Sequence, residues 1–290
     1  MVTKISKERV KRNIRTVALN LLVAVFALIV IFPLYVMVIT AVKPFGEAMY
    51  FSWWPSEISF EAFEFILIPN EATIEMGLSL VRAFRNTLIT TIPGTTIGVF
   101  VSAASAYVFA KKDFTGKNVC FTILLSALML PGAVQMVSMY LIYAKIGWVN
   151  TLLPLLIPPM FGTVGLMFAF RQFMYSIPDE MLESARMDGA GEFYILIKMV
   201  LPLSKAVIGA HWLLQFMNGY NQYIEPLLYI FDPEWETLQL TLSRYTQTVG
   251  ATNMPVVMAA ATISMIPLVI LYACSQKLFE KGIMTGSVKG

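Results

Sequence analysis

Six stretches of this chain contain no Asp, Glu, Lys or Arg, and they constrain its fold more than any other feature. They span 16–42, 86–110, 118–144, 146–170, 206–224 and 245–276. About 20 apolar residues in a helix cross a bilayer core, so each stretch is long enough, or nearly so, for one crossing. Because lipid offers the backbone no hydrogen-bonding partners, such segments must be helical. We therefore expect an all-α, polytopic membrane protein with six transmembrane helices.

A large soluble protein with buried helices is the alternative, and composition argues against it. Only 13% of the 290 residues are charged and 57% are hydrophobic, whereas soluble domains carry about 25% charged residues. Helices in ordinary globular proteins average about 11–12 residues, and each of the six stretches is much longer than that.

The basic residues predict the orientation. If the N-terminus is cytoplasmic, 16 of the 21 Lys and Arg residues fall on the cytoplasmic side, and only Lys43, Arg82, Arg85, Lys145 and Arg244 remain outside. The positive-inside rule then places both termini in the cytoplasm. The net charge of +3 does not indicate nucleic acid, because the basic residues lie where they orient the helices.

The first apolar stretch is predicted to be an uncleaved helix. It is much longer than the ~7–15 residues of a signal-peptide core, and no small-x-small cleavage site precedes Lys43. Cys120 and Cys274 both fall inside apolar stretches and indicate neither a disulfide framework nor a metal site. The chain has no G-x-x-x-x-G-K-[ST] motif, so we expect no P-loop ATP site and no cofactor in it.

These features predict the organisation of the chain. The expected parts are a cytoplasmic tail (1–16), a first transmembrane helix (17–42), an extracytoplasmic loop (43–85), a core with helices two to six (86–279) that includes a cytoplasmic loop (176–200), and a cytoplasmic tail (280–290). The extracytoplasmic loop is expected to hold short helices around 60–67. Trp53 and Trp54 read as interfacial anchors.

Two patterns in the core predict close helix packing and irregular helices. Small residues recur at Gly94, Gly98, Ser102 and Ala106, a spacing that lets helix backbones approach closely in lipid. Prolines lie inside the apolar stretches, at positions 33, 93, 131, 154, 158, 159 and 267. Each bends or breaks its helix, which favours a transport pathway between irregular helices.

The cytoplasmic loop carries a short helix with clear start and stop signals. Ser176 is predicted to cap it, Pro178 and Asp179 lie in its first turn, and Gly189 ends it. After Gly191, a second helix is expected to run through Leu201-Pro202 into the stretch 206–224. A solvated connector is the plain alternative.

The residue pattern of this loop resembles the E-A-A-x-x-x-G…L-P signature of binding-protein-dependent ABC import permeases. The fuller form, E-L-x-E-A-A-x-x-D-G-A, is matched by Glu180, Leu182, Glu183, Ala185, Asp188, Gly189 and Ala190, with Ser184 in place of the middle alanine. The stretch 216–227 and the tail G-S-V-K-G at 286–290 resemble those of the carbohydrate, maltose-type (MalG-like) permeases, with Gly219-Tyr220 and Glu225 as departures.

The resemblance implies a multi-pass transport subunit, not an enzyme, in a bacterial or archaeal cytoplasmic (inner) membrane. Its implied partners are a second permease, two cytoplasmic ATPases that use ATP and Mg, and an extracytoplasmic solute-binding protein that delivers a sugar or oligosaccharide. It also implies that the loop helix couples to the ATPase through Glu180, Glu183, Ser184, Ala185, Asp188 and Gly189.

Polar residues near the end of the fifth stretch are the candidates for the substrate path. They are Asn218, Tyr220, Asn221, Gln222, Tyr223 and Glu225, with Gln135 after the Pro131 kink as a weaker candidate. Amides and carboxylates bind sugar hydroxyls and aromatic rings stack on sugar faces, but each residue could equally serve hydrogen bonding between helices. His211, alone in its stretch, is interpreted as a packing residue and not a proton relay.

Three other functions compete with a sugar importer. An ion-driven secondary transporter requires paired ionisable groups at the membrane midplane, and the apolar stretches hold none beyond His211. A membrane enzyme requires clustered acid–base groups, which one histidine does not provide. An ABC permease for a non-sugar solute remains an alternative, because only the resemblance to sugar permeases argues against it.

Overall fold

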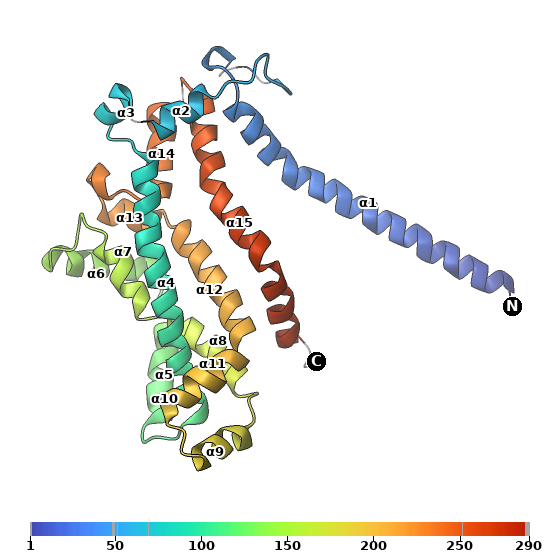
Figure 1. Ribbon diagram of the computed structural model, residues 1–290, viewed down its shortest axis with the longest axis vertical. Helices are drawn as coiled ribbons and strands as arrows, with labels where there is room; N and C mark the ends of the chain where they lie inside the picture. Colours follow the sequence, from blue (N-terminus) through green and yellow to red (C-terminus); the bar gives the residue numbers. More distant parts are fainter. Residues whose placement is uncertain (1, 48–49, 51, 69, 251, 288–290) are drawn as a thin grey trace. The chain divides into compact units, whose positions relative to one another are not determined.

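The computed structural model describes residues 2–47, 50, 52–68, 70–250 and 252–287. Every regular element in these ranges is a helix, in agreement with the all-α expectation (Figure 1). The chain forms two compact units, Met1–Asn70 with Tyr245–Ile263, and Glu71–Arg244 with Ser264–Gly290. Residues 288–290 of the G-x-V-K-G tail lie outside the described residues.

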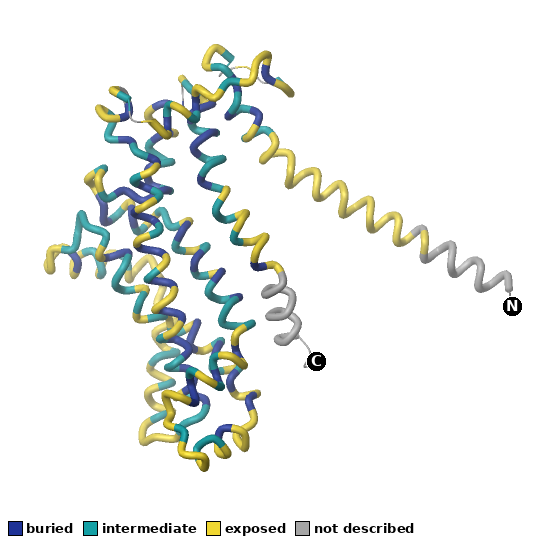
Figure 2. The backbone as a smooth tube through the Cα atoms, viewed as in Figure 1, coloured by how far each residue is buried: buried dark blue, intermediate teal, exposed yellow. Residues whose placement is uncertain are grey.

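The first unit begins with one long apolar helix and two short helices. Its elements are α1 (Val2–Ala41), η1 (Phe45–Glu47) and α2 (Glu61–Leu67), the last of which matches the short helix expected around 60–67. The side chains along the apolar part of α1, such as Leu28, are exposed (Figure 2). The Trp53 ring packs against Phe32, and the hydroxyl of Tyr35 donates a hydrogen bond to the Trp53 carbonyl oxygen.

The second unit holds most of the helices. They are α3 (Glu71–Glu75), α4 (Leu80–Lys111), α5 (Lys117–Ala127), α6 (Gly132–Lys145), α7 (Leu153–Met160), α8 (Val164–Met174), α9 (Asp179–Met187), α10 (Glu192–Ile195), η2 (Leu196–Val200), α11 (Leu201–Leu203), α12 (Lys205–Tyr220), α13 (Ile224–Tyr229) and η3 (Pro233–Trp235). The remaining helices, α14 (Leu238–Thr248) and α15 (Met254–Ser287), each contribute residues to both units.

Helix α4 is the central element of the second unit and packs against α7, α8 and α12. Its small residues allow the close approach that their spacing predicts. A Cβ atom added to Gly98 would lie 2.1 Å from the Pro159 carbonyl oxygen, and one on Gly162 would lie 2.2 Å from the Ser102 hydroxyl. That hydroxyl accepts a hydrogen bond of 3.2 Å from the Thr163 amide. The prediction of tight packing is therefore confirmed.

Two sharp bends interrupt the helices, one inside the third apolar stretch and one just before the fifth. The pair α5 and α6 is bent by 95°, and the segment from Glu192 to Leu203 is bent by 81° against α12. Pro131 lies at the first break and has an extended backbone. The π-helical turn η2 and then Pro202, in α11, precede the second break. Proline lacks the amide hydrogen that continues a helix, and π-turns are a common cause of bends.

Four described helices are long and apolar enough to cross a membrane, and the count rises to six if each bent pair is one crossing. The second helix, expected to run from Gly191 through Leu201-Pro202 into the fifth stretch, is broken at Ser204, where the chain bends before α12.

Candidate functional site

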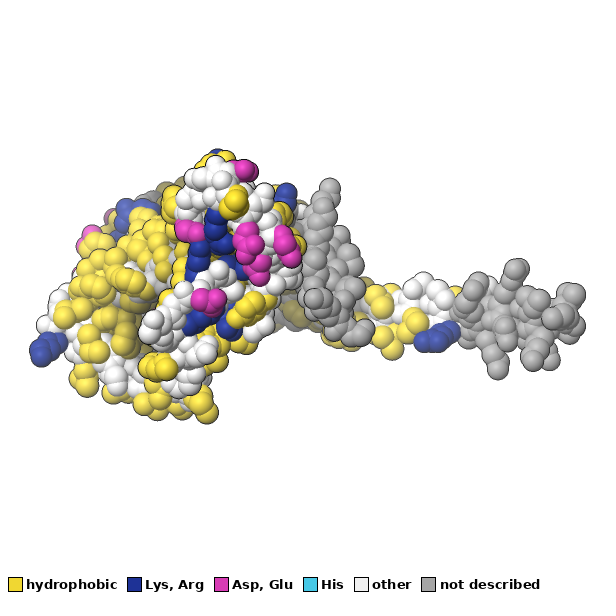
Figure 3. Space-filling model, turned by 90° about the horizontal axis from the view of Figure 1, so that it is seen from below, with side chains coloured by type: hydrophobic (Ala, Val, Ile, Leu, Met, Phe, Trp, Pro, Cys, Tyr) yellow, Lys and Arg dark blue, Asp and Glu magenta, His cyan; other side chains and the backbone are white. Residues whose placement is uncertain are grey.

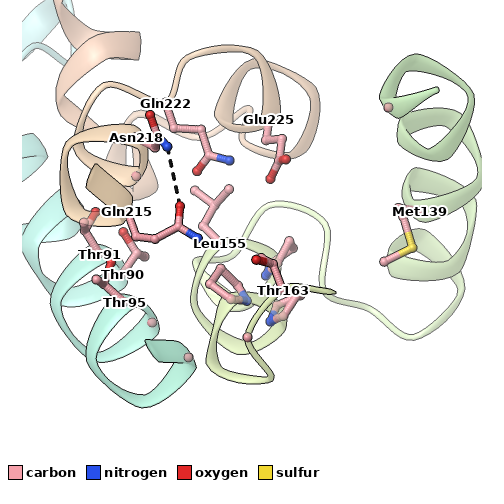
Figure 4. Close-up of a pocket in the computed structure, with 18 of the residues that line it drawn as sticks. Thr90, Thr91, Thr95, Met139, Leu155, Thr163, Gln215, Asn218, Gln222 and Glu225 are labelled. Carbon is pink, nitrogen blue, oxygen red and sulfur yellow. Dashed lines mark hydrogen bonds between the residues drawn. The ribbon is translucent and has the colours of Figure 1, made fainter. Parts of the chain in front are cut away.

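A cavity of about 580 Å³ lies inside the second unit, between α4, α6, α7, α12 and α13 (Figure 4). Its polar wall is formed by Thr90, Thr91, Thr95, Gln135, Thr163, Gln215, Asn218, Gln222 and Glu225. Apolar and aromatic side chains complete it, among them Met139, Tyr143, Leu155 and Tyr229. A space of this size, with amides beside aromatic rings, is typical of a small-molecule site.

Four polar side chains of the cavity lie together on the wall formed by α12 and the start of α13. Figure 4 shows Gln215, Asn218, Gln222 and Glu225 next to one another, with Met139 on the opposite wall. The Asn218 side-chain amide donates to the side-chain oxygen Oε1 of Gln215 at 3.4 Å. Glu225 is the one charged residue among the described residues that line the cavity.

The structure brings together four of the seven substrate-path candidates. Asn218, Gln222, Glu225 and Gln135 line the cavity. The other three lie outside its wall and have partners elsewhere. The Tyr220 hydroxyl donates to the Ser264 carbonyl oxygen at 2.8 Å, the Asn221 amide donates to the Met217 carbonyl oxygen at 3.0 Å, and the Tyr223 hydroxyl lies 3.2 Å from the Ser243 hydroxyl.

Sequence reasoning missed several polar residues of the wall. Gln215 lies three residues before Asn218 on α12, a helical spacing that could have identified it. Thr91 and Thr95 on α4 are likewise one turn apart. His211 stays outside this wall. Its Nδ1 atom lies 2.9 Å from the Val207 carbonyl oxygen and its ring packs edge-on against Phe170, as the packing interpretation expects.

The second candidate feature is the loop helix α9, at the end of the second unit where α4 finishes (Figure 1). Pro178 is its N-cap residue, so the prediction that Ser176 caps it is wrong. The Ser176 hydroxyl instead donates to the Phe173 carbonyl oxygen at 2.7 Å. Gly189 follows the helix with a φ of +85°, a backbone conformation that glycine adopts readily, and this confirms the predicted stop.

Helix α9 has one buried face and one exposed face. Leu182 is fully buried in the core cluster that includes Phe170 and Ile195, and Ala185 packs against the same cluster. The remaining coupling candidates, Glu180, Glu183, Ser184, Asp188 and Gly189, are all exposed. Seen from this end, acidic and basic side chains lie side by side on the surface (Figure 3). The exposed face carries carboxylates and small groups.

Ion pairs hold the loop to α4. Lys111, at the end of α4, donates to the Ile177 carbonyl oxygen at 2.6 Å and to the Asp179 carboxylate at 2.8 Å. The hydrogen bond from Lys111 lowers the pKa of Asp179 below its ordinary value.

A second set of contacts converges on Glu192. Its carboxylate accepts hydrogen bonds from the Tyr107 hydroxyl at 2.6 Å and from Arg186 at 3.0 Å, and it pairs with Lys112. Tyr107 lies on α4 and Arg186 on α9. The loop helix is therefore attached to the cavity-lining helix α4, in addition to its covalent path through α10 to α12.

Comparison with known proteins assigns most of the chain to the family that the pattern of the loop resembles. Residues 94–285 match the family model described as binding-protein-dependent transport system inner membrane component. The arabinooligosaccharides transport system permease protein AraQ of Bacillus subtilis is 28% identical over 282 residues, covering 96% of this chain and 97% of that protein. The melibiose/raffinose/stachyose import permease protein MelC of the same organism is 30% identical over 279 residues, covering 94% and 96%.

A permease named for a different solute and a solved structure are also similar to this chain. The sn-glycerol-3-phosphate transport system permease protein UgpE of Rhizobium meliloti is 32% identical over 210 residues, covering 72% of this chain and 74% of that protein. A bacterial ABC transporter involved in the import of the acidic polysaccharide alginate superimposes with a TM-score of 0.79 at 23% identity, covering 91% of this chain and 96% of that chain. This likeness shows the fold.

Proposed function

This chain belongs to the family of binding-protein-dependent transport system inner membrane components, and on that premise we propose that it is the permease subunit of an ATP-binding-cassette importer for a sugar or oligosaccharide. It is a multi-pass protein of the inner membrane. The observation that carries the sugar assignment is the cavity, whose amides, threonines and tyrosines suit a ligand rich in hydroxyl groups. The full-length relatives are named for sugar transport, which supports the same assignment.

The family description implies a solute-binding protein and ATPase partners. In our proposal the full assembly contains this chain, a second permease, two ATPases that use ATP and Mg, and an extracytoplasmic binding protein. In this assembly the carboxylates of the loop act as contacts and not as acids or bases. A reconstituted complex should hydrolyse ATP faster when its binding protein is loaded with a neutral oligosaccharide. Stimulation by a non-sugar solute alone would refute the sugar assignment.

The contacts of α9 suggest how a movement driven by ATP hydrolysis is transmitted to the helices that line the cavity. The exposed carboxylates of α9 would rest on the ATPase, and ATPase closure would then move α9. Because Lys111 and Glu192 attach the loop to α4, the movement would reach Thr90, Thr91 and Thr95 as well as α12. Two discrete packings of these helices would open the cavity to alternate sides of the membrane.

We further propose the orientation that the basic residues predict, with both termini and the loop 176–200 in the cytoplasm. A cysteine introduced at Ala190 should react with a membrane-impermeant maleimide only after the cytoplasmic side is exposed. A cysteine introduced at Ser56, in the proposed extracytoplasmic loop 43–85, is the control and should react from the outside. Labelling of residue 190 from outside intact cells would refute the proposed six-crossing arrangement.

Substitutions in the cavity should separate transport from assembly. We expect Asn218→Ala and Glu225→Ala to lower uptake about tenfold, because each removes a hydrogen-bonding partner that faces the cavity. Asn221→Ala is the matched control, since its amide bonds the α12 backbone outside the cavity wall. The measurement is uptake into vesicles at equal amounts of assembled complex. Equal uptake by all three variants would reduce Asn218 and Glu225 to residues that stabilise the helix packing.

A further inference from the structure

A second pocket, of about 470 Å³, lies at the same end of the second unit as the loop helix. It is formed where the α4–α5 connection, the first turn of α5 and the end of α8 meet. Its lining residues are Asp113, Phe114, Gly116, Lys117, Asn118, Val119, Arg171 and Tyr175. None of these residues belongs to the cavity or to the coupling helix described above.

Arg171 is held in place by aromatic rings and not by an acid. Its guanidinium carbon lies 3.8 Å from the centre of the Phe121 ring and 4.7 Å from that of Tyr175, and its Nε atom donates to the Phe109 carbonyl oxygen at 3.3 Å. Among the described residues no carboxylate forms an ion pair with it. A positioned planar guanidinium is well suited to binding a phosphate group through two parallel hydrogen bonds.

Lys117 and Asn118 add further donors to the pocket. The Lys117 ammonium group lies 2.6 Å from the Lys112 carbonyl oxygen and 3.1 Å from the Asp113 carboxylate. The Asp113 side chain is fully exposed, so water screens this ion pair and its strength is small. Two cations and one anion leave the pocket with a net charge of +1, which favours an anion.

The surroundings of the pocket distinguish a lipid from a free anion. Phe114 and Tyr175 are exposed at its rim, and Val119 and Ile123 are each 63% exposed one turn apart on α5. Aromatic side chains favour the headgroup level of a bilayer, and an exposed apolar helix face can accompany acyl chains. The polar pocket therefore opens directly onto a surface suited to hydrocarbon.

We propose that this pocket binds the phosphate of an anionic phospholipid, with Arg171 and Lys117 on the headgroup and Val119 and Ile123 along an acyl chain. The lipid belongs to the leaflet on the side of the coupling loop. It would join α5 to α8 beside the α4–α5 connection, near Lys112, which pairs with Glu192 of the loop.

The test is native mass spectrometry of the purified protein with its co-purifying subunits, titrated with phosphatidylglycerol or phosphatidylcholine. Wild type should bind phosphatidylglycerol more tightly than phosphatidylcholine. R171Q/K117Q should weaken phosphatidylglycerol binding about thirtyfold, because each of the two basic residues contributes about 1 kcal/mol at an anionic membrane surface and about 1.4 kcal/mol corresponds to a factor of ten. K145Q is the matched control, because Lys145 is an exposed basic residue outside the pocket.

Equal binding of the two lipids by wild type, or an equal loss in K145Q, would overturn the proposal. Displacement of the lipid by millimolar inorganic phosphate would show that a free anion is the ligand and would also overturn it. If the loss of Arg171 packing prevents purification of the double variant, K117Q/N118A removes donors without touching the aromatic stack, and it should weaken phosphatidylglycerol binding in the same direction. Failure of this test would leave the cavity and coupling assignments untouched.

Discussion

Gly189→Pro is expected to abolish stimulated ATP hydrolysis while the permease still inserts in the membrane. Gly189 has a φ of +85°, and proline is confined to a φ near −65°. The substitution also removes the amide that donates to the Arg186 carbonyl oxygen at 3.0 Å and closes the end of α9. The exposed face of α9 would therefore no longer be held in position to contact the ATPase.

Glu183→Lys tests the same interface without changing the backbone. Glu183 is exposed on α9, and reversing its charge would place a cation where the partner is expected to be basic. Like charges brought together at an interface cost several kcal/mol. The variant should thus lose the co-purifying ATPase or its stimulation, with the amount of inserted permease unchanged.

Gly191→Ala is the matched control for both variants. Gly191 lies two residues beyond Gly189, has an ordinary φ of −71°, and a Cβ atom there would meet nothing within 4 Å. Co-purification of the ATPase and stimulated hydrolysis in vesicles are the two measurements. Full activity of Gly189→Pro and Glu183→Lys would mean that the loop is a connector only, and the proposed coupling role would fall.

Gly98→Leu is expected to prevent formation of the packed core of the second unit. Even the Cβ atom of the new residue would lie 2.1 Å from the Pro159 carbonyl oxygen, and that atom belongs to backbone that cannot turn aside as a side chain could. Helices α4 and α7 would have to separate, so the destabilisation should reach about 3 kcal/mol or more.

The yield of monodisperse protein and its melting temperature in detergent measure this effect. Gly165→Ala is the control, because a Cβ atom at Gly165, within α8, would meet nothing within 4 Å and alanine favours helix over glycine. A Gly98→Leu protein with wild-type yield and melting temperature would contradict the close approach of α4 and α7.

The amino-acid sequence by itself determined the membrane class, the small-residue packing face and the position where the loop helix stops. Each of these depends on local chemistry. Charge-free stretches must be helical in lipid because the backbone has no other partners there. A glycine after an amphipathic turn ends a helix because glycine tolerates a positive φ, and Gly189 does so.

Only the tertiary structure decided which polar residues share the cavity. Helix α12 ends at Tyr220, and the turn before α13 breaks the helical period, so spacing cannot tell which way Asn221 or Tyr223 points. The attachment of the loop to α4 depends on partners far apart in the chain, such as Lys111 with Ile177 and Tyr107 with Glu192. Contacts of this kind arise from how the helices pack, and the local periodicity of the sequence does not determine that packing.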